Sequence, residues 1–233
     1  MWLNQLQGEF LSEVAVTLEI LEAPQVARLY FWALQVCFVD DRRISGAGHL
    51  GLQWHPDYPA STAVNWGGYA DDWAGGGELD GSEAELPSAL SNPNTRDFVW
   101  RPNTPYRFRI AQPPGSEGGA WRGQVTDIAA DTTVTVRDLF ARGSLCGRPV
   151  VWSEVFADCD APPVSVRWSN FVVRTATDRL LAPSSVRVTH QAPSAGGCTN
   201  TNSFCDSVGV VQRTNSKRAN ANGSHLKLPV LAR

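Results

Sequence analysis

The sequence predicts an all-β protein in which two antiparallel sheets pack face to face as a jelly-roll sandwich. Segments rich in Val, Thr, Ile and aromatic residues recur along the chain, and short clusters of Gly, Pro, Asn and Asp separate most of them. Helical periodicity is scarce. The segments number about twelve, which is too many for one flat open sheet and natural for two packed sheets.

The individual segments differ in how they alternate. Segment 27–39 is apolar on both faces, and its apolar run 29–39 is interrupted only by Gln35, so we expect a central strand that is covered on both sides. Segment 106–112 alternates apolar residues with arginines, as a half-exposed strand does. Two prolines after residue 161 end a ladder, so we expect the strands on either side of them to form a hairpin. In chain order, the expected strands are 13–21, 27–39, 49–55, 63–69, 98–101, 106–112, 120–128, 132–140, 149–157, 164–175, 185–191 and 208–214.

The chain is expected to form one domain over residues 1–233. No linker separates two self-sufficient cores, and the longest non-periodic stretch, 70–95, is an acidic loop rich in Gly and Ser. The part after about residue 192 is expected to be stapled by disulfides. Oligomeric state is left open.

Charge and hydropathy exclude two classes of partner. The formal net charge is −3, and the only local basic cluster is 213–218, so nucleic acid is not expected. No apolar run reaches the roughly 18 residues needed to span a bilayer. The N-terminal segment lacks a basic region and carries two glutamates among its apolar residues, so it does not match an intact signal peptide.

Five cysteines are present. Cys146, Cys159, Cys198 and Cys205 lie beside turn signals and suit two disulfides, with three connectivities open. Cys37 sits in an apolar run and is interpreted as a buried free thiol. Disulfides favour an extracellular or cell-envelope location.

Several segments carry a family resemblance. The succession YFWALQVCF, GHLGLQWH, TPYRFRI, WRGQVTD and VVWSEVF resembles the strand series of the concanavalin-like lectins and glucanases. Over residues 13–215 the chain also resembles an uncharacterised bacterial family with similar Trp-x-Gly-x-Val-x-Asp and Trp-Ser-Glu segments. The resemblance implies the sandwich fold and a carbohydrate ligand.

The stretch VVWSEVF holds the most informative carboxylate. Side chains alternate along a strand, so Trp152, Glu154 and Phe156 share one face while small residues share the other. The small-residue face can pack on the opposite sheet and leave the aromatic face open. Trp supplies a flat apolar platform and Glu accepts hydroxyl hydrogen bonds, a combination that suits a sugar.

Two other roles for Glu154 stay open. A structural acid would pair with an arginine such as Arg107 or Arg109, because an unpaired buried carboxylate is costly. A hydrolytic acid needs a second carboxylate. Asp158 lies roughly 13 Å along the same strand at about 3.3 Å per residue, too far away, so the partner would be Asp127. The Glu-x-Asp-x-x-Glu string of the retaining glucanases is absent.

The acidic loop offers a calcium hypothesis. Asp71, Asp72 and Asp80 supply the hard oxygen ligands that calcium prefers, but the EF-hand spacing is absent. A solvated loop is the favoured interpretation, and no other cofactor is expected.

These observations lead to a prediction of a non-enzymatic, lectin-like carbohydrate-binding domain whose partner is a glycan or polysaccharide. The first alternative is a polysaccharide-active hydrolase or lyase that uses Glu154 with Asp127, and the second is a structural or protein-interaction β-sandwich. The residues predicted to contact the sugar are Gln53, Trp66, Trp121, Trp152, Glu154 and Asn170.

Overall fold

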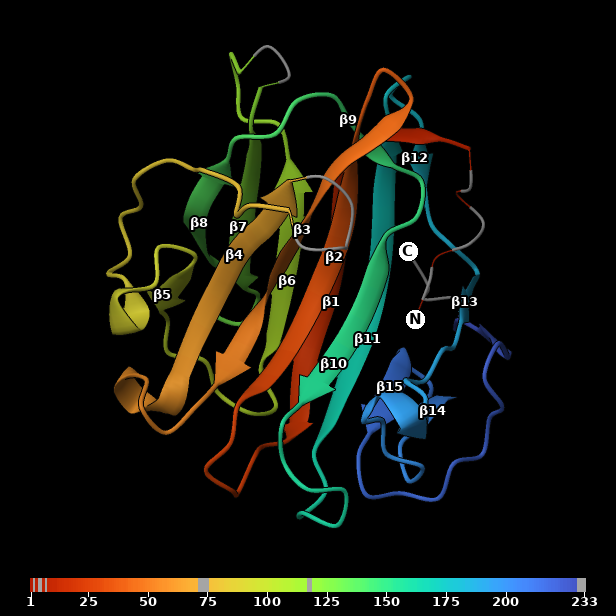
Figure 1. The fold of residues 1–233 in the computed structure, drawn as a ribbon. Helices are drawn as coiled ribbons and strands as arrows, with labels where there is room; N and C mark the ends of the chain where they lie inside the picture. The colour runs from red at the N-terminus through yellow and green to blue at the C-terminus, as the bar shows by residue number, and fades with distance from the viewer. Residues whose placement is uncertain (2, 4–5, 7, 71–75, 117–118, 230–233) are drawn as a thin grey trace.

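The protein is all-β, and its antiparallel sheets form a sandwich (Figure 1). The computed structural model describes residues 1, 3, 6, 8–70, 76–116, 119–229. Within these residues, three short 3-10 helices lie in connections (Pro59–Ser61, Ala89–Ser91 and Pro193–Ala195). None of the helices described is long and apolar enough to cross a membrane.

The first sheet carries the candidate site. It is built around β2, which pairs with β3 on one side and with β10 on the other. The order β10-β2-β3-β4-β5 makes β10 an edge strand. Its strands are β2 (Tyr30–Asp40), β3 (Arg43–Trp54), β4 (Thr62–Ala70), β5 (Thr95–Asp97) and β10 (Val150–Val155).

The second sheet packs behind the first. Its centre is β1, which pairs with β6 and β11. Strand β9 (Ser144–Cys146) pairs with the ends of both β1 and β2 and joins the two sheets. The second sheet contains β1 (Phe10–Glu22), β6 (Pro105–Ala111), β7 (Trp121–Asp127), β8 (Thr132–Leu139), β11 (Ser165–Thr175), β12 (Leu180–Leu181), β14 (Asn202–Cys205) and β15 (Val210–Arg213), and a separate ladder joins β13 (Ser185–Arg187) to β16 (His225–Lys227).

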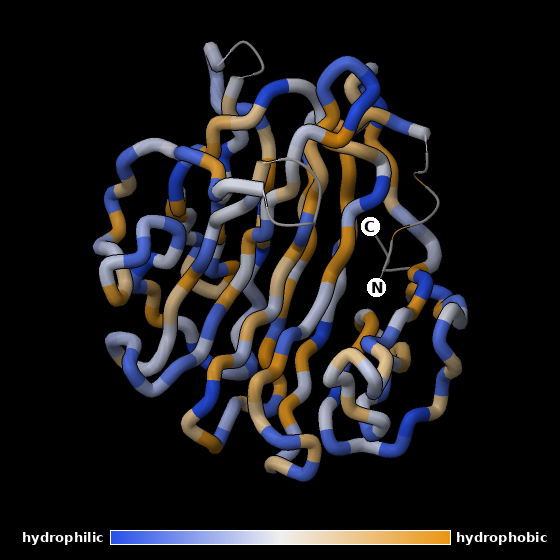
Figure 2. The backbone as a smooth tube through the Cα atoms, in the orientation of Figure 1, coloured by the Kyte–Doolittle hydropathy of each residue, from blue (hydrophilic) through white to orange (hydrophobic). Residues whose placement is uncertain are grey.

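The core lies between the inner faces of the two sheets. Hydrophobic residues concentrate along the central strands and hydrophilic residues at the loops (Figure 2). Trp66 is fully buried and donates its indole N–H to the backbone oxygen of Trp121 at 3.0 Å. A Cβ at position 123 would lie 2.6 Å from the Trp66 ring, so Gly123 is the residue that lets the ring pack there.

Two predictions of strand arrangement are wrong. β10 and β11 do not form a hairpin, because β10 pairs with β2 and β11 pairs with β1. The segment between them crosses from one sheet to the other. The strand predicted at 98–101 does not form: the ladder between β4 and β5 ends at Asp97, and the indole of Trp100 is buried and donates to the backbone oxygen of Gln53.

The prediction of two disulfides is confirmed, and Cys146, Cys159 and Cys198 are bonded as predicted, but the roles expected of Cys37 and Cys205 are exchanged. Cys37 bonds to Cys146, and Cys159 bonds to Cys198. Cys205 is the free thiol and donates to a backbone oxygen at 3.1 Å. The reason is the short strand β9, which aligns beside the end of β2 and brings Cys146 to Cys37.

Candidate functional site

Glu154 and Gln53 lie in one row across the outer face of the first sheet. Glu154 pairs with Phe31 of β2, and Phe31 pairs with Gln53 of β3. Directly paired residues of antiparallel strands project on the same face, so all three side chains leave the sheet together. With strands spaced about 4.8 Å apart, the backbones of Glu154 and Gln53 are about 10 Å apart, a gap that two long side chains can narrow toward a small group bound between them.

The ring of Phe31 leans away from this row. Its centroid lies 4.9 Å from that of Trp152 and 5.6 Å from that of His49, both edge to face. A Cβ added to Gly51 would lie 2.7 Å from the Phe31 ring, so the ring covers that glycine. Phe31 therefore leaves the space between Glu154 and Gln53 to other groups.

Glu154 is an exposed carboxylate with no ion-pair or hydrogen-bond partner among the described side chains. Neighbouring protein atoms still displace part of its water, and this burial raises the pKa of the Glu154 carboxyl above the usual range for glutamate. A carboxyl in this state can hold or release a proton closer to neutral pH than an ordinary surface glutamate.

Gln53 presents its amide in a fixed orientation. Its side chain is buried, and its Oε1 accepts hydrogen bonds from the Tyr58 hydroxyl at 3.0 Å and from Thr95 Oγ1 at 3.4 Å. The carbonyl side of the amide is therefore occupied. The amide nitrogen, for which no described residue provides an acceptor, is the group left to donate a hydrogen bond.

Trp152 forms a wall beside the row. Its indole N–H donates to Oε1 of Gln35 at 2.7 Å, and its side chain is half-buried against Phe31 and His49. The hydrogen bond and the ring contacts fix the indole on the face of β10 that also carries Glu154.

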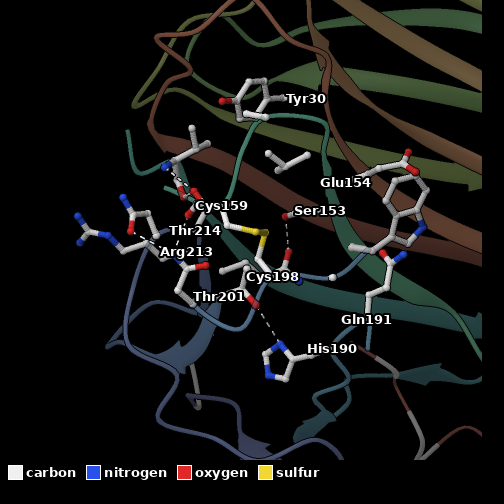
Figure 3. Close-up of a pocket in the computed structure, with 18 of the residues that line it drawn as sticks. Tyr30, Ser153, Glu154, Cys159, His190, Gln191, Cys198, Thr201, Arg213 and Thr214 are labelled. Carbon is white, nitrogen blue, oxygen red and sulfur yellow. Dashed lines mark hydrogen bonds between the residues drawn. A yellow bond between two sulfur atoms is a disulfide. The ribbon is translucent and has the colours of Figure 1, made fainter. Parts of the chain in front are cut away.

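A cavity of about 840 Å³ opens along β10, and Glu154 lies on its wall (Figure 3). The opposite wall comes from the C-terminal segment, where the Cys159–Cys198 disulfide is exposed to the cavity. Arg218 holds this wall by donating to the backbone oxygens of Cys198 and Thr201 and to the Thr201 hydroxyl. The wall also contains His190, whose pKa is lowered by burial and by the charge of Arg218.

His49 supports the aromatic wall in its neutral form. Burial lowers the pKa of His49 from 6.5 to about 4. The unfolded chain therefore binds a proton that the folded protein rejects between these two pH values. Stability contributed by the neutral ring is present above pH 6.5 and is lost as the pH falls toward 4.

We expect this loss to reach about 3 kcal/mol at pH 4, since one pKa unit corresponds to about 1.4 kcal/mol. His49→Phe keeps a ring in place but removes the titration, so its free energy of unfolding should depend less on pH than that of the wild type. Urea denaturation at pH 7 and at pH 4.5 measures the difference. His225→Phe, at an exposed position, is the control and should leave the pH dependence unchanged; equal pH dependence in wild type and His49→Phe would contradict the expectation.

Three of the predicted contact residues lie away from this site. Trp66 and Trp121 are fully buried in the core and cannot act as stacking platforms. Asn170 lies on β11 of the second sheet, where its amide donates to Thr17 at 3.4 Å. Only Trp152, Glu154 and Gln53 are brought together.

Asp127 does not serve as the second carboxylate. It ends β7 in the second sheet, accepts the backbone N–H of Ala130 at 3.0 Å and lies 3.8 Å from Arg101. The hypothesis of a hydrolytic pair with Glu154 is therefore wrong. The arginine hypothesis is also wrong for Arg109, which pairs with Glu13 at 2.7 Å.

The calcium hypothesis falls mostly outside the described residues, because Asp71 and Asp72 are not among them. Asp80 accepts the backbone N–H of Phe140 through its own backbone oxygen. Within the part of the chain that the structure describes, no three or more His, Cys, Asp or Glu residues are grouped so that they would hold a metal ion.

Comparison with known proteins gave distant structural likenesses. No family model matches the chain, and no curated protein matches it. Among solved structures, scytalido-glutamic peptidase with a transition-state analogue inhibitor covers 89% of this chain and 94% of its own, with 12% identity and a TM-score of 0.49. The same peptidase with a peptide-based analogue gives 11% identity, 90% and 94% coverage and a TM-score of 0.47. SCP-B, a member of the eqolisin family of peptidases bound to the tripeptide Ala-Ile-His, gives 10% identity, 89% and 94% coverage and a TM-score of 0.46.

These findings contradict the prediction of a non-enzymatic, lectin-like domain. The solved structures that the chain resembles are peptidases by their titles, and a glycan partner has no support. A likeness this distant does not assign an activity to the chain.

Gln35, Tyr58 and His49 also belong to the site, although the sequence pattern does not predict them there. The sequence does mark Gln35, because it is the one polar residue that interrupts the apolar run 29–39. It does not mark Tyr58 or His49, because their roles depend on strand pairings that only the folded chain reveals.

Proposed function

We propose that the protein hydrolyses amide bonds of peptides, with Glu154 as its acid–base group. The observation that carries this proposal is an unpaired carboxyl with a raised pKa that lies in one row with the fixed amide of Gln53. General acid–base catalysis needs a proton carrier whose pKa approaches the working pH, and partial burial provides it.

In the proposed reaction, the Glu154 carboxylate takes a proton from a water molecule while the water oxygen attacks the carbonyl carbon of the substrate. Negative charge moves to the carbonyl oxygen, and the fixed amide nitrogen of Gln53 donates a hydrogen bond to it. Glu154 then gives the proton to the departing nitrogen, and the C–N bond breaks. The products are a carboxylic acid and an amine, and Glu154 returns to its starting state.

The outer-face geometry supports this assignment independently of the fold likeness. Glu154 and Gln53 lie on the two strands that flank β2, and the Phe31 ring lies over Gly51 instead of between them. Trp152, which its hydrogen bond to Gln35 fixes, lies on the same face of β10 as Glu154. One base and one oriented donor on opposite sides of a gap are what a single hydrolytic step requires.

The test is incubation of the full-length protein with a mixture of peptides in heavy-oxygen water at several pH values from acidic to neutral. Mass spectrometry should detect new C-termini that carry one heavy oxygen, as hydrolysis requires. Glu154→Gln should abolish them, whereas Glu22→Gln, on the other sheet, should not. Absence of cleavage by the wild type at every pH would rule the proposal out.

Three broader expectations accompany the proposal. We infer the jelly-roll connectivity of the concanavalin-like sandwiches, one domain over residues 1–233, and a location outside the cell or in its envelope. Two disulfides support the location, because such bonds persist in oxidising compartments.

A further inference from the structure

The hydrogen bonds of β10 show which of its backbone groups point toward β2 and which point away from it. Val151 exchanges backbone hydrogen bonds with Met1, and Pro149 accepts one from Leu3, so their polar groups point away from β2. Phe156 donates to Leu29 on the β2 side. Because the direction alternates residue by residue along a strand, Ser153 and Val155 also point their backbone groups away from β2.

Nothing described in the chain pairs with this part of the edge. Met1 and Leu3 cover the edge only at Pro149 and Val151, and no described residue bonds to the outward backbone groups of Ser153 or Val155. Both residues are half-exposed and line the cavity of about 840 Å³. Unpaired edge groups of this kind are a template for another strand.

The cavity wall also contains a buried hydroxyl that has no hydrogen-bond partner among the described residues. It belongs to Tyr30, which pairs with Val155 and lines the cavity. Burial raises the pKa of this hydroxyl, so it stays a neutral donor and acceptor.

We propose that the β10 edge at Ser153–Val155 is a docking site for an extended peptide segment of a partner polypeptide, which adds as an antiparallel strand. The segment continues the line that Met1 and Leu3 already follow along the same edge. Backbone hydrogen bonds bind it, and the hydroxyl and amide groups of the C-terminal wall read its side chains. Glu154 lies on the wall of the same cavity, but its side chain leaves the sheet in the row with Gln53, so occupation of the β10 edge does not depend on the proposed hydrolysis.

Proline substitution isolates this edge. Val155→Pro removes one outward N–H and places a ring where the peptide would pair, but it leaves the bonds between β10 and β2 intact, as proline does on edge strands. Val155→Ala retains the N–H and is the matched control. A melting temperature close to that of the wild type shows that Val155→Pro is folded.

The probe is the tightest heptapeptide that a random phage-displayed library yields on the immobilised full-length protein. We expect calorimetry to show binding at least about tenfold weaker to Val155→Pro and within about twofold of wild type for Val155→Ala. Mass spectrometry of the recovered peptide scores cleavage separately, so a failure of the proposed function does not affect the result. Failure to select any peptide, or equal affinity for wild type and Val155→Pro, would overturn the proposal.

A second measurement needs no protein variant. The heptapeptide is synthesised with one backbone amide methylated at a time and titrated into the wild type. Strand addition predicts that methylation weakens binding at alternate positions only, since only every second amide faces β10. A uniform loss, or no loss at any position, would overturn strand addition even if Val155→Pro proved unstable.

Discussion

Replacing Glu154 with glutamine is expected to lower kcat/KM for peptide hydrolysis by about 10²- to 10⁴-fold, the usual contribution of a positioned acid–base group. Glutamine keeps the size and much of the polarity of the side chain but cannot carry the proton. The measurement is cleavage of the best substrate found in the heavy-oxygen experiment. Asp158→Asn removes a carboxylate from the same cavity and is the matched control, so comparable losses in both variants would show that cavity charge matters rather than Glu154 itself.

Glu154→Gln is also expected to make the folded protein slightly more stable at neutral pH. Burial raises the pKa of Glu154 in the folded protein, so the folded state prefers the neutral acid more than the unfolded state does. Stability from this group is present below the usual glutamate pKa of 4.5 and is lost as the pH rises through the raised value. At neutral pH, Glu154→Gln should therefore melt at a slightly higher temperature than the wild type, and the difference should vanish in acid.

Removing the Cys37–Cys146 disulfide is expected to lower the free energy of unfolding by about 5 kcal/mol. The bond closes a loop with a sequence separation of 109, and the entropy that a disulfide removes from the unfolded chain grows with loop length. The bond also ties β9 to β2, where the two sheets meet. Denaturant unfolding of Cys37→Ala/Cys146→Ala measures the loss.

The second disulfide is the control for this prediction. Cys159 and Cys198 are separated by only 39 residues, so their removal should cost less, about 4 kcal/mol in the same chain-entropy treatment. If the free energy of unfolding of Cys37→Ala/Cys146→Ala lies within about 1 kcal/mol of the wild-type value, the bond does not constrain the unfolded chain as expected.

The strands of the fold could be predicted because their pattern is local. β2 stands out by its apolar residues on both faces, and β6 by its strict alternation. The partners of each strand could not be predicted. The prolines at 162 and 163 predict a hairpin, but β10 pairs with β2 of the first sheet and β11 pairs with β1 of the second.

The candidate site was predictable only in part for the same reason. Alternation within β10 placed Trp152 and Glu154 on one face, and the structure has them there. The row with Gln53 required the register across β2 and β3, and the pairing of Cys37 required β9, a strand of three residues. Trp66 and Trp121 were indistinguishable in sequence from surface platforms, because a tryptophan in an alternating strand suits either a core or a binding face.

The central claim is that Glu154 is the acid–base group of an amide hydrolase. The most direct test is an NMR titration of the carboxyl carbon of Glu154, assigned with Glu154→Gln, beside the pH profile of kcat/KM for peptide cleavage. Because the base must be ionised to accept the proton of water, kcat/KM should rise with pH through the pKa that the carbon reports, and this pKa should lie above 4.5. A Glu154 carboxyl that titrates at 4.5 or below, or a rate profile whose midpoint differs from the titration, would contradict the account.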